Sequence, residues 1–212
     1  MNCPVILLGA GGHAKVLINT LRLCSVEIIG ATDPTASLHG QVIMGVKVLG
    51  SDEELNNYSA DKVKLVNAVG STTLPKIRSR LFAEFKNRGF VFVDIIHPSA
   101  VIASDVKTGE GSQIMAGAVI QPGVSLGDNV IINTSSSIDH DCIIGSHSHL
   151  APGVTISGEV VIGEGVHVGV GATVIQGVKI GKRSLIGAGS LVLENIPAGV
   201  KAFGCPAKVQ KR

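Results

Sequence analysis

Residues 150–174 read LAPGVTISGEVVIGEGVHVGVGATV, and a large aliphatic side chain returns at every sixth position of this stretch. Followed in both directions, the series has seventeen members between positions 96 and 192, and sixteen of them are Ile, Leu or Val. A second series of smaller residues follows four positions behind the first, for example Ala118, Val124, Ser136, Cys142 and Ala172. Neither an α-helix nor a plain strand has a period of six, so this repeat indicates a solenoid.

The repeat predicts a parallel β-helix built from short flat faces, with the large aliphatic side chain pointing inward. The smaller side chain is expected near a corner, where space is limited. The residue before it is often Gly or Asn, which suits a corner that needs positive φ. Three faces make a coil of 18 residues, so the seventeen hexads give nearly six coils. The period alone does not fix the hand of the coil.

The chain changes character near position 95, because every aromatic residue except Phe203 lies before residue 93. We predict an α/β domain over residues 1–95, a β-helix over 96–198 and a C-terminal tail over 199–212. In the first domain, strands are expected at residues 5–8, 26–30 and 63–69, and residues 90–95 close the unit. A helix is expected at 13–23, with Val16, Leu17 and Leu21 on one face. A second helix, capped by Thr72 and Thr73 with Pro75 in its first turn, ends at Gly89.

The composition excludes several classes of protein. Of 212 residues, 45% are hydrophobic and 16% charged, and the mean hydropathy of +0.41 excludes a disordered chain. The formal charge is +2 with 3% aromatics, so we expect no nucleic-acid partner. No apolar run reaches the roughly 18 residues of a membrane span, and no signal peptide is expected. The cysteines show no paired spacing, which predicts reduced thiols in a cytoplasmic protein: Cys3, Cys24, Cys142 and Cys205.

A glycine-rich turn follows the first expected strand. Gly9-x-Gly11-x-x-Ala14 fits the turn at which backbone amides and a helix N-terminus face a phosphate. Asp33 follows the second strand about twenty residues later, where an acid can bind ribose hydroxyls. A nicotinamide dinucleotide would need a second half-domain, and about 95 residues hold only one, so a nucleotide carrying a sugar fits better. The alternative is a tight turn that only packs helix on strand.

His140 is the strongest candidate for catalysis, because Asp139 and Asp141 flank it at an outward corner of the expected β-helix. A neighbouring carboxylate favours imidazolium and can fix the tautomer, which suits a general base. A solvated turn and a metal site shared with His147 and His149 are the alternatives. Cys142 occupies an inward slot and is expected in the core. His149 and His167 are 18 residues apart, so they should stack on successive coils.

The sequence resembles the hexapeptide-repeat sugar acyltransferases that carry an N-terminal nucleotide-sugar domain. This group includes the UDP-4-amino-sugar N-acetyltransferases of bacillosamine synthesis, the GDP-perosamine N-acetyltransferases and the sialic acid O-acetyltransferase-like proteins. The resemblance covers essentially the whole chain. Its marks are Gly9-Ala10-Gly11-Gly12-His13-Ala14-Lys15-Val16, Ile96-His97-Pro98-Ser99-Ala100, Ile132-Asn133-Thr134, Asp139-His140-Asp141-Cys142 and Gly204-Cys205-Pro206-Ala207-Lys208.

The resemblance implies a Rossmann-like half domain followed by a left-handed β-helix, and a homotrimer with active sites between subunits. It implies that His140 is the base and Asp141 the carboxylate that raises its basicity. Contacts to acetyl-CoA would fall on His149, Val170, Gly187 and Ala188, and contacts to the nucleotide sugar on Gly11, Gly12, His13, Asp33 and Gly70. No metal is implied. Many relatives carry two adjacent acids after the second strand, whereas Pro34 replaces the second here, which weakens any inference about the nucleotide.

We therefore expect an acetyl-CoA-dependent N-acetyltransferase acting on the 4-amino group of a nucleotide-linked amino deoxy sugar, with UDP favoured. The amine attacks the thioester directly and His140 takes its proton. O-acetylation of a sugar of the sialic acid type is the alternative within the enzyme class. A non-catalytic trimer that uses the β-helix as a scaffold is the alternative outside it. A sugar-1-phosphate nucleotidyltransferase is excluded, because the first domain is too short.

Overall fold

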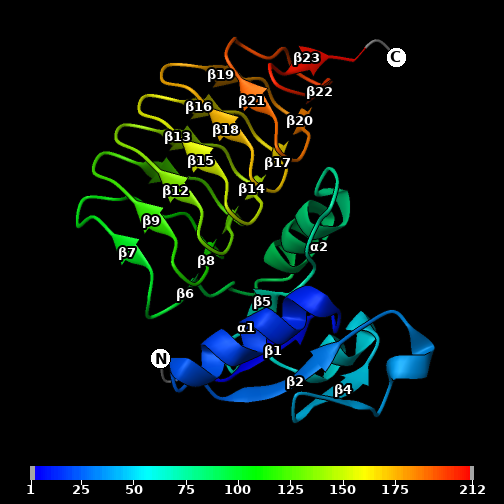
Figure 1. Ribbon diagram of the computed structural model, residues 1–212. Helices are drawn as coiled ribbons and strands as arrows, with labels where there is room; N and C mark the ends of the chain where they lie inside the picture. Colours follow the sequence, from blue (N-terminus) through cyan, green and yellow to red (C-terminus); the bar gives the residue numbers. More distant parts are fainter. Residues whose placement is uncertain (1–2, 211–212) are drawn as a thin grey trace.

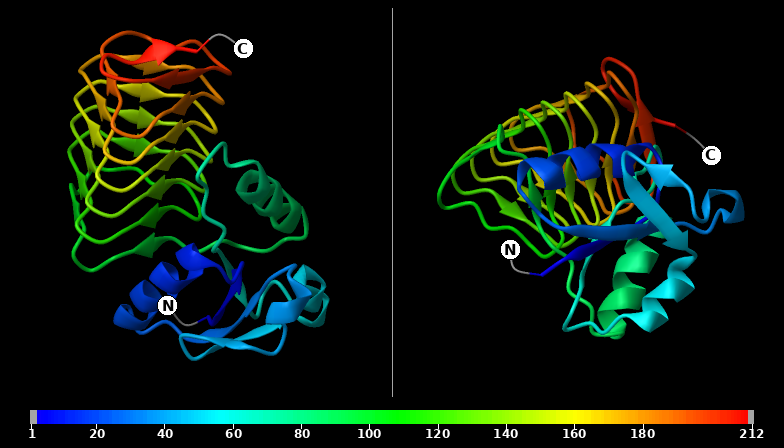
Figure 2. Two further views of the ribbon diagram at one scale, coloured as in Figure 1. Left: turned by 45° about the vertical axis from the view of Figure 1, so that its right-hand side comes forward. Right: turned by 90° about the horizontal axis from the view of Figure 1, so that it is seen from below.

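The computed structural model describes residues 3–210 and contains an α/β domain followed by a long β-helix (Figure 1). Residues 1, 2, 211 and 212, at the outer ends of the expected first domain and tail, lie outside the described residues. The β-helix stands with its first coils on the α/β domain, and α2 lies alongside it (Figure 2). Within residues 3–210, no helix combines the length and apolar character that a membrane crossing requires.

The first domain is a five-stranded sheet with a helix on each face. Its strand order is β3-β4-β2-β1-β5, and all neighbours are parallel except β3 and β4. The strands are β1 (Val5–Leu8), β2 (Ile28–Thr32), β3 (Val42–Ile43), β4 (Val46–Gly50) and β5 (Lys64–Asn67). Alternate side chains of β1 enter two separate cores, one with α1 (Gly12–Leu23) and one with α2 (Lys76–Asn87). Two short 3-10 helices, Ala36–Leu38 and Asp52–Asn57, complete the domain.

Several local expectations for this domain are wrong. Val16 is 43% exposed, whereas Leu17 and Leu21 are buried, because neighbouring positions on a helix point about 100° apart. Thr72 and Thr73 do not cap α2, since Pro75 occupies the N-cap position and no side chain caps it. The strand expected at 26–30 runs two residues later, and the antiparallel β3–β4 pair was not expected at all.

The rear half is a left-handed β-helix with three sheets of very short strands. Sheet C, which faces the α/β domain, contains β6 (Ile95–Ile96), β8 (Gln113–Ile114), β11 (Ile131–Ile132), β14 (His149–Leu150), β17 (His167–Val168), β20 (Leu185–Ile186), β22 (Lys201–Phe203) and β23 (Lys208–Val209). Sheet D contains β7 (Val101–Ile102), β9 (Val119–Ile120), β12 (Ser137–Ile138), β15 (Thr155–Ile156), β18 (Thr173–Val174) and β21 (Leu191–Val192). Sheet E contains β10 (Ser125–Leu126), β13 (Ile143–Ile144), β16 (Val161–Ile162) and β19 (Lys179–Ile180).

The interior of the β-helix follows the six-residue repeat. Every member of the aliphatic series from Ile114 to Val192 is buried, which confirms the inward orientation. Ile96 is an exception at 43% exposed, because it lies on the first coil, where the stack begins and no earlier coil covers it. The corner prediction is also confirmed, since every sixth residue from Gly111 to Gly189 has positive φ, including Asp141 and His147.

A second glycine series occupies one edge of the prism, between sheets E and C, with a spacing of 18 residues. The series consists of Gly109, Gly127, Gly145, Gly163 and Gly181. A Cβ added to any of these glycines would lie 2.4–2.6 Å from a backbone atom of the next coil. Normal contacts between heavy atoms are about 3.5–4.0 Å. Glycine is therefore required at this edge for close stacking of successive coils rather than for its φ. This glycine series was not among the features expected from the sequence.

Candidate functional site

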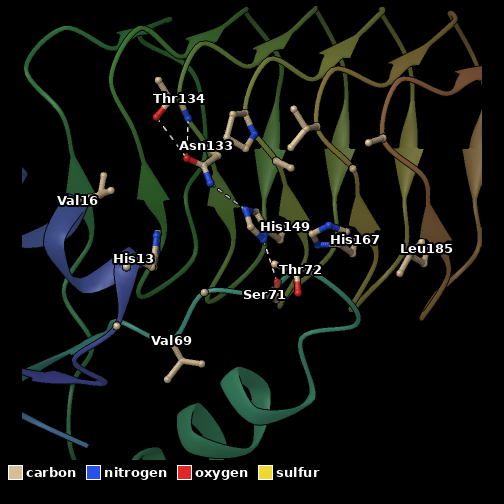
Figure 3. A pocket seen from close by; sticks show the side chains of 18 of the residues that line it. His13, Val16, Val69, Ser71, Thr72, Asn133, Thr134, His149, His167 and Leu185 are labelled. Atoms are coloured by element: carbon tan, nitrogen blue, oxygen red, sulfur yellow. Dashed lines mark hydrogen bonds between the residues drawn. The ribbon is translucent and has the colours of Figure 1, made fainter. Parts of the chain in front are cut away.

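A cavity of about 920 Å³ lies where the α/β domain faces sheet C and the following corner of the prism (Figure 3). It is bounded by the loops that leave β1 and β5 at their carboxyl ends, which is where ligands bind in parallel α/β sheets. Nine of the eleven site residues expected from the sequence line it: Gly11, Gly12, His13, Asp33, Gly70, His149, Val170, Gly187 and Ala188. His140 and Asp141 do not.

The glycine-rich turn leaves the N-terminus of α1 open to this cavity. Gly9 has a φ of 106°, which glycine tolerates best, and Gly11 is the N-cap with no side-chain hydrogen bond to the helix. A Cβ added at Gly11 or Gly12 would meet nothing within 4 Å. The first-turn amides have no partners within the helix, so they can bind an anion in the cavity.

Asp33 follows β2 directly and organises the same edge of the sheet. Its two carboxylate oxygens accept hydrogen bonds from the backbone N–H of Ala10, at 3.0 Å, and of Thr35, at 2.9 Å. Burial alone would raise the pKa of Asp33, but these hydrogen bonds outweigh it and lower the pKa below its usual value. The carboxylate is therefore ionised at neutral pH and retains lone pairs for a further donor, such as a hydroxyl group.

His13 connects the α/β domain to the first coils of the β-helix. Its Nε2 lies 2.8 Å from Oε1 of Gln113, whose Nε2 donates to the carbonyl oxygen of Asn67 at 2.8 Å. Because the Gln113 oxygen can only accept, Nε2 of His13 carries the proton. Burial, reinforced by the nearby charge of Arg78, lowers the pKa of His13 to about 4, so the ring is neutral at pH 7.

His149 lies on β14 and is only 5% exposed. Its Nδ1 lies 2.9 Å from the hydroxyl of Ser71, and its Nε2 lies 3.1 Å from the amide nitrogen of Asn133. Burial, with smaller effects from His167, His13 and Arg78, lowers its pKa to about 2. The rings of His149 and His167 meet edge to face at 5.0 Å, which confirms the predicted stacking on successive coils.

His140 and Asp141 form a separate cluster on the corner between sheets D and E. Nδ1 of His140 lies 2.9 Å from a carboxylate oxygen of Asp141, and both side chains are largely exposed, at 46% and 65%. The hydrogen bond with Asp141 raises the pKa of His140, although desolvation opposes it and the charge of Asp139 adds to it. Since the carboxylate accepts a hydrogen bond from Nδ1–H, neutral His140 presents an unprotonated Nε2.

Two glycines make room for this His140–Asp141 pair. A Cβ at Gly158, 18 residues beyond His140, would lie 2.5 Å from Nε2 of His140. A Cβ at Gly123, 18 residues before Asp141, would contact the Asp141 carboxylate at 2.4 Å. The imidazole and the carboxylate therefore each rest against a glycine of an adjacent coil, which limits where the ring can lie.

The three histidines considered together as metal ligands are separated by the fold. His140 is on the D–E corner, His147 on the E–C corner and His149 on the face of sheet C. His147 is half-buried, lies 3.0 Å from the side-chain amide of Asn129 and contacts Phe82 edge to face. Among residues 3–210, no group of three or more His, Cys, Asp or Glu side chains is arranged to hold a metal ion. Cys142 is buried in the prism, as expected.

Several polar side chains at the cavity or behind it were not among the expected site residues. The cavity is also lined by Ser71, Thr72, Asn133, Thr134 and His167. The sequence gave a signal for His167 through its 18-residue spacing from His149, and for Asn133 and Thr134 through the resemblance. Arg78 of α2 is fully buried and donates to the carbonyl oxygens of Asn67, Val69 and Asn129. Burial lowers its pKa to about 9. A buried cation on an amphipathic helix has no distinctive sequence pattern.

Known family models match both halves of the chain. The model of the PglD N-terminal domain matches residues 4–85. The bacterial transferase hexapeptide (six repeats) matches residues 105–139, 123–158 and 159–194. A search of curated proteins found no match.

Several solved structures are similar over the whole chain. PerB from Caulobacter crescentus, solved with CoA and GDP-perosamine, is 38% identical, with a TM-score of 0.92 and coverage of 100% of this chain and 99% of that one. The acetyltransferase domain of PglB from Neisseria gonorrhoeae FA1090 is 32% identical, with a TM-score of 0.91 and coverage of 99% and 100%. WeeI from Acinetobacter baumannii AYE is 25% identical, with a TM-score of 0.89 and the same coverage.

The fold and these matches define the class: the chain is an acyltransferase with a left-handed β-helix. It belongs to the family of hexapeptide-repeat sugar acetyltransferases that carry a PglD-type N-terminal domain, because the 38% identity to PerB extends over its full length.

Proposed function

We propose that this chain transfers the acetyl group of acetyl-CoA to the amino group of a nucleotide-linked amino sugar. The observation that carries the proposal is that the open N-terminus of α1 and the corner that holds Val170, Gly187 and Ala188 line the same cavity. The α/β side of this cavity can bind a diphosphate, and the prism side can bind the extended arm of CoA. PerB binds CoA and GDP-perosamine on the same fold, and the gonococcal PglB domain binds acetyl-CoA.

The chemistry assigned to His140 is general base catalysis. As the amine of the sugar attacks the thioester carbonyl, Nε2 of His140 takes the amine proton, and the imidazolium then protonates the departing CoA thiolate. Asp141 accepts a hydrogen bond from Nδ1–H and stabilises the imidazolium that forms. Histidine-substituted mutants of perosamine N-acetyltransferase were solved with CoA and GDP-perosamine, which supports a functional histidine in that relative.

The proposed active site is shared between copies of the chain in a homotrimer. Within one chain, sheet D separates the cavity corner from the corner that carries His140 and Asp141. A second prism packed against the first would bring its D–E corner to the cavity, and a threefold ring would close this contact three times. Exposed apolar side chains on the prism, including Val101, Ile143 and Val170, suit such packing.

The test measures CoA thiol release from acetyl-CoA with UDP-, GDP- and dTDP-linked 4-amino sugars and with free sialic acid. We expect rapid thiol release with one nucleotide sugar, and we predict that this sugar is linked to UDP. His140→Ala should lower kcat by roughly 10²–10⁴-fold, with an unchanged oligomer by light scattering. Near-normal turnover of this variant would refute the base assignment.

Two alternatives are resolved by the same panel. Release with sialic acid alone would identify a sugar O-acetyltransferase, since His140 could deprotonate a hydroxyl as well as assist an amine. Release with no acceptor would favour a non-catalytic scaffold. The His140–Asp141 pair and the stacked rings of His149 and His167 argue against the scaffold, because such clusters of ionisable groups are typical of functional sites.

A further inference from the structure

One chain of hydrogen bonds crosses the cavity from the β-helix to the α/β domain (Figure 3). The backbone N–H of Thr134 donates to Oδ1 of Asn133 at 2.8 Å. The amide nitrogen of Asn133 lies 3.1 Å from Nε2 of His149, and Nδ1 of His149 lies 2.9 Å from Oγ of Ser71. The chain therefore begins at a backbone amide on the prism and ends at a hydroxyl on the loop that follows β5.

The direction of every bond in this chain is fixed by its first member. A backbone N–H can only donate, so Asn133 presents its oxygen to Thr134 and its NH₂ group to His149. Nε2 of His149 must then accept, and the buried ring is neutral at pH 7. The single ring proton is consequently on Nδ1, which donates to Ser71.

Ser71 is left with a hydroxyl proton that points away from His149. Among residues 3–210, this hydroxyl makes no other hydrogen bond. Ser71 lines the cavity next to Gly70, and β5, which precedes it, is paired in parallel with β1, which ends at the glycine-rich turn. The Ser71 hydroxyl and the open amides of α1 therefore face the same volume.

We propose that Ser71 donates a hydrogen bond to the diphosphate of the nucleotide sugar, and that His149 is a positioning residue for Ser71 rather than a contact for acetyl-CoA. This inference rests on the proposed function, since it assumes a nucleotide-linked acceptor. A diphosphate is favoured because hydroxyls and helix N-terminal amides are its usual partners at the carboxyl edge of such sheets. His149 offers no free nitrogen to a second ligand, because both are already hydrogen-bonded.

The first test is the tautomer of His149. Long-range ¹H–¹⁵N correlation spectra of the wild-type protein at pH 7 should show a neutral ring protonated at Nδ1, identified by its loss in His149→Phe. A ring protonated at Nε2 would reverse the chain, make Ser71 the donor to His149 and overturn the inference.

The second test is nucleotide affinity. Binding of UDP, GDP and dTDP is measured by calorimetry for wild type, Ser71→Ala and the adjacent surface control Thr73→Ala. Ser71→Ala removes one hydrogen bond to a charged oxygen, so its affinity for the preferred nucleotide should fall by about tenfold or more. Thr73→Ala should leave this affinity unchanged. His149→Phe should also lower the nucleotide affinity, whereas Ser71→Thr should retain most of it.

Acetyl-transfer kinetics separate this inference from the proposed function. Ser71→Ala should raise KM for the nucleotide sugar and leave KM for acetyl-CoA unchanged. A raised KM for acetyl-CoA alone, or unchanged nucleotide affinity in an active enzyme, would overturn the inference and leave the proposed function intact. Ser71-dependent nucleotide binding without acetyl transfer to any amino sugar would instead contradict the proposed function.

Discussion

Gly158→Ala tests whether His140 acts from the position that the fold gives it. The backbone of Gly158 is outside the positive-φ region, so alanine introduces no backbone strain. Its Cβ would lie 2.5 Å from Nε2 of His140, whereas an ordinary contact is about 3.5 Å. The imidazole must therefore move by about 1 Å, which its exposed position allows at little cost in stability.

A displacement of this size at a reacting group can lower the rate by about 10²-fold. We expect Gly158→Ala to reduce kcat by about this factor, with KM for both substrates and the unfolding midpoint in urea nearly unchanged. The assay is initial-rate thiol release under saturating acetyl-CoA. His140→Ala provides the matched background, because Gly158→Ala should have little further effect once the imidazole is absent.

Two results would refute this reasoning. A fully active Gly158→Ala enzyme would show that the position of the His140 ring does not matter. An equal loss of kcat in the wild-type and His140→Ala backgrounds would show that the substitution acts elsewhere.

Three further changes test the fold and the electrostatics. Gly145→Ala should lower the free energy of unfolding by about 3 kcal/mol or more in urea, because its Cβ would lie 2.6 Å from a backbone nitrogen of the next coil. Asp141→Asn should move the acid limb of the kcat/KM profile to lower pH, because Asp141 raises the pKa of His140 and only the neutral ring accepts a proton. Arg78→Met should also cost about 3 kcal/mol or more, since three carbonyl oxygens lose a buried donor.

Each of these variants has a matched control. Gly153→Ala has open space around its Cβ but a φ of 69°, so it should cost only about 1–2 kcal/mol. Equal destabilisation by Gly145→Ala and Gly153→Ala would contradict the stacking argument. Arg80→Met, at an exposed position of the same helix, should be nearly neutral, and an equal loss there would contradict the role of Arg78. An unmoved acid limb in Asp141→Asn would show that Asp141 does not tune the base.

The β-helix could be predicted almost completely from the sequence, because one side chain in six has the same environment on every coil. Ile114 and Val192 lie more than four coils apart, yet both are fully buried by the same rule. The rule fails at Ile96, where the stack begins. The α/β domain was harder, since each of its elements occurs once and no repeat averages out local errors such as the Thr72 cap.

The site could be predicted where it follows local backbone geometry. The Gly9–Gly12 turn and Asp33 were found because a glycine turn and a strand-end acid are local patterns. The link from Ser71 through His149 to Asn133 joins three segments, and their proximity depends on how the α/β domain packs on sheet C. No pattern within any one segment encodes that packing, so the resemblance could suggest a role for His149 but not its hydrogen-bond partners.

The most direct test of the shared active site is subunit complementation. His140→Ala lacks the base, and Gly12→Phe fills the cavity beside α1, where a side chain meets open space. The two variants are co-expressed with different tags, and trimers that carry both tags are purified. Each mixed ring would hold one intact site of three, so about a third of wild-type activity should return although each variant alone is inactive. Mixed oligomers as inactive as their parents would contradict a site built from two copies.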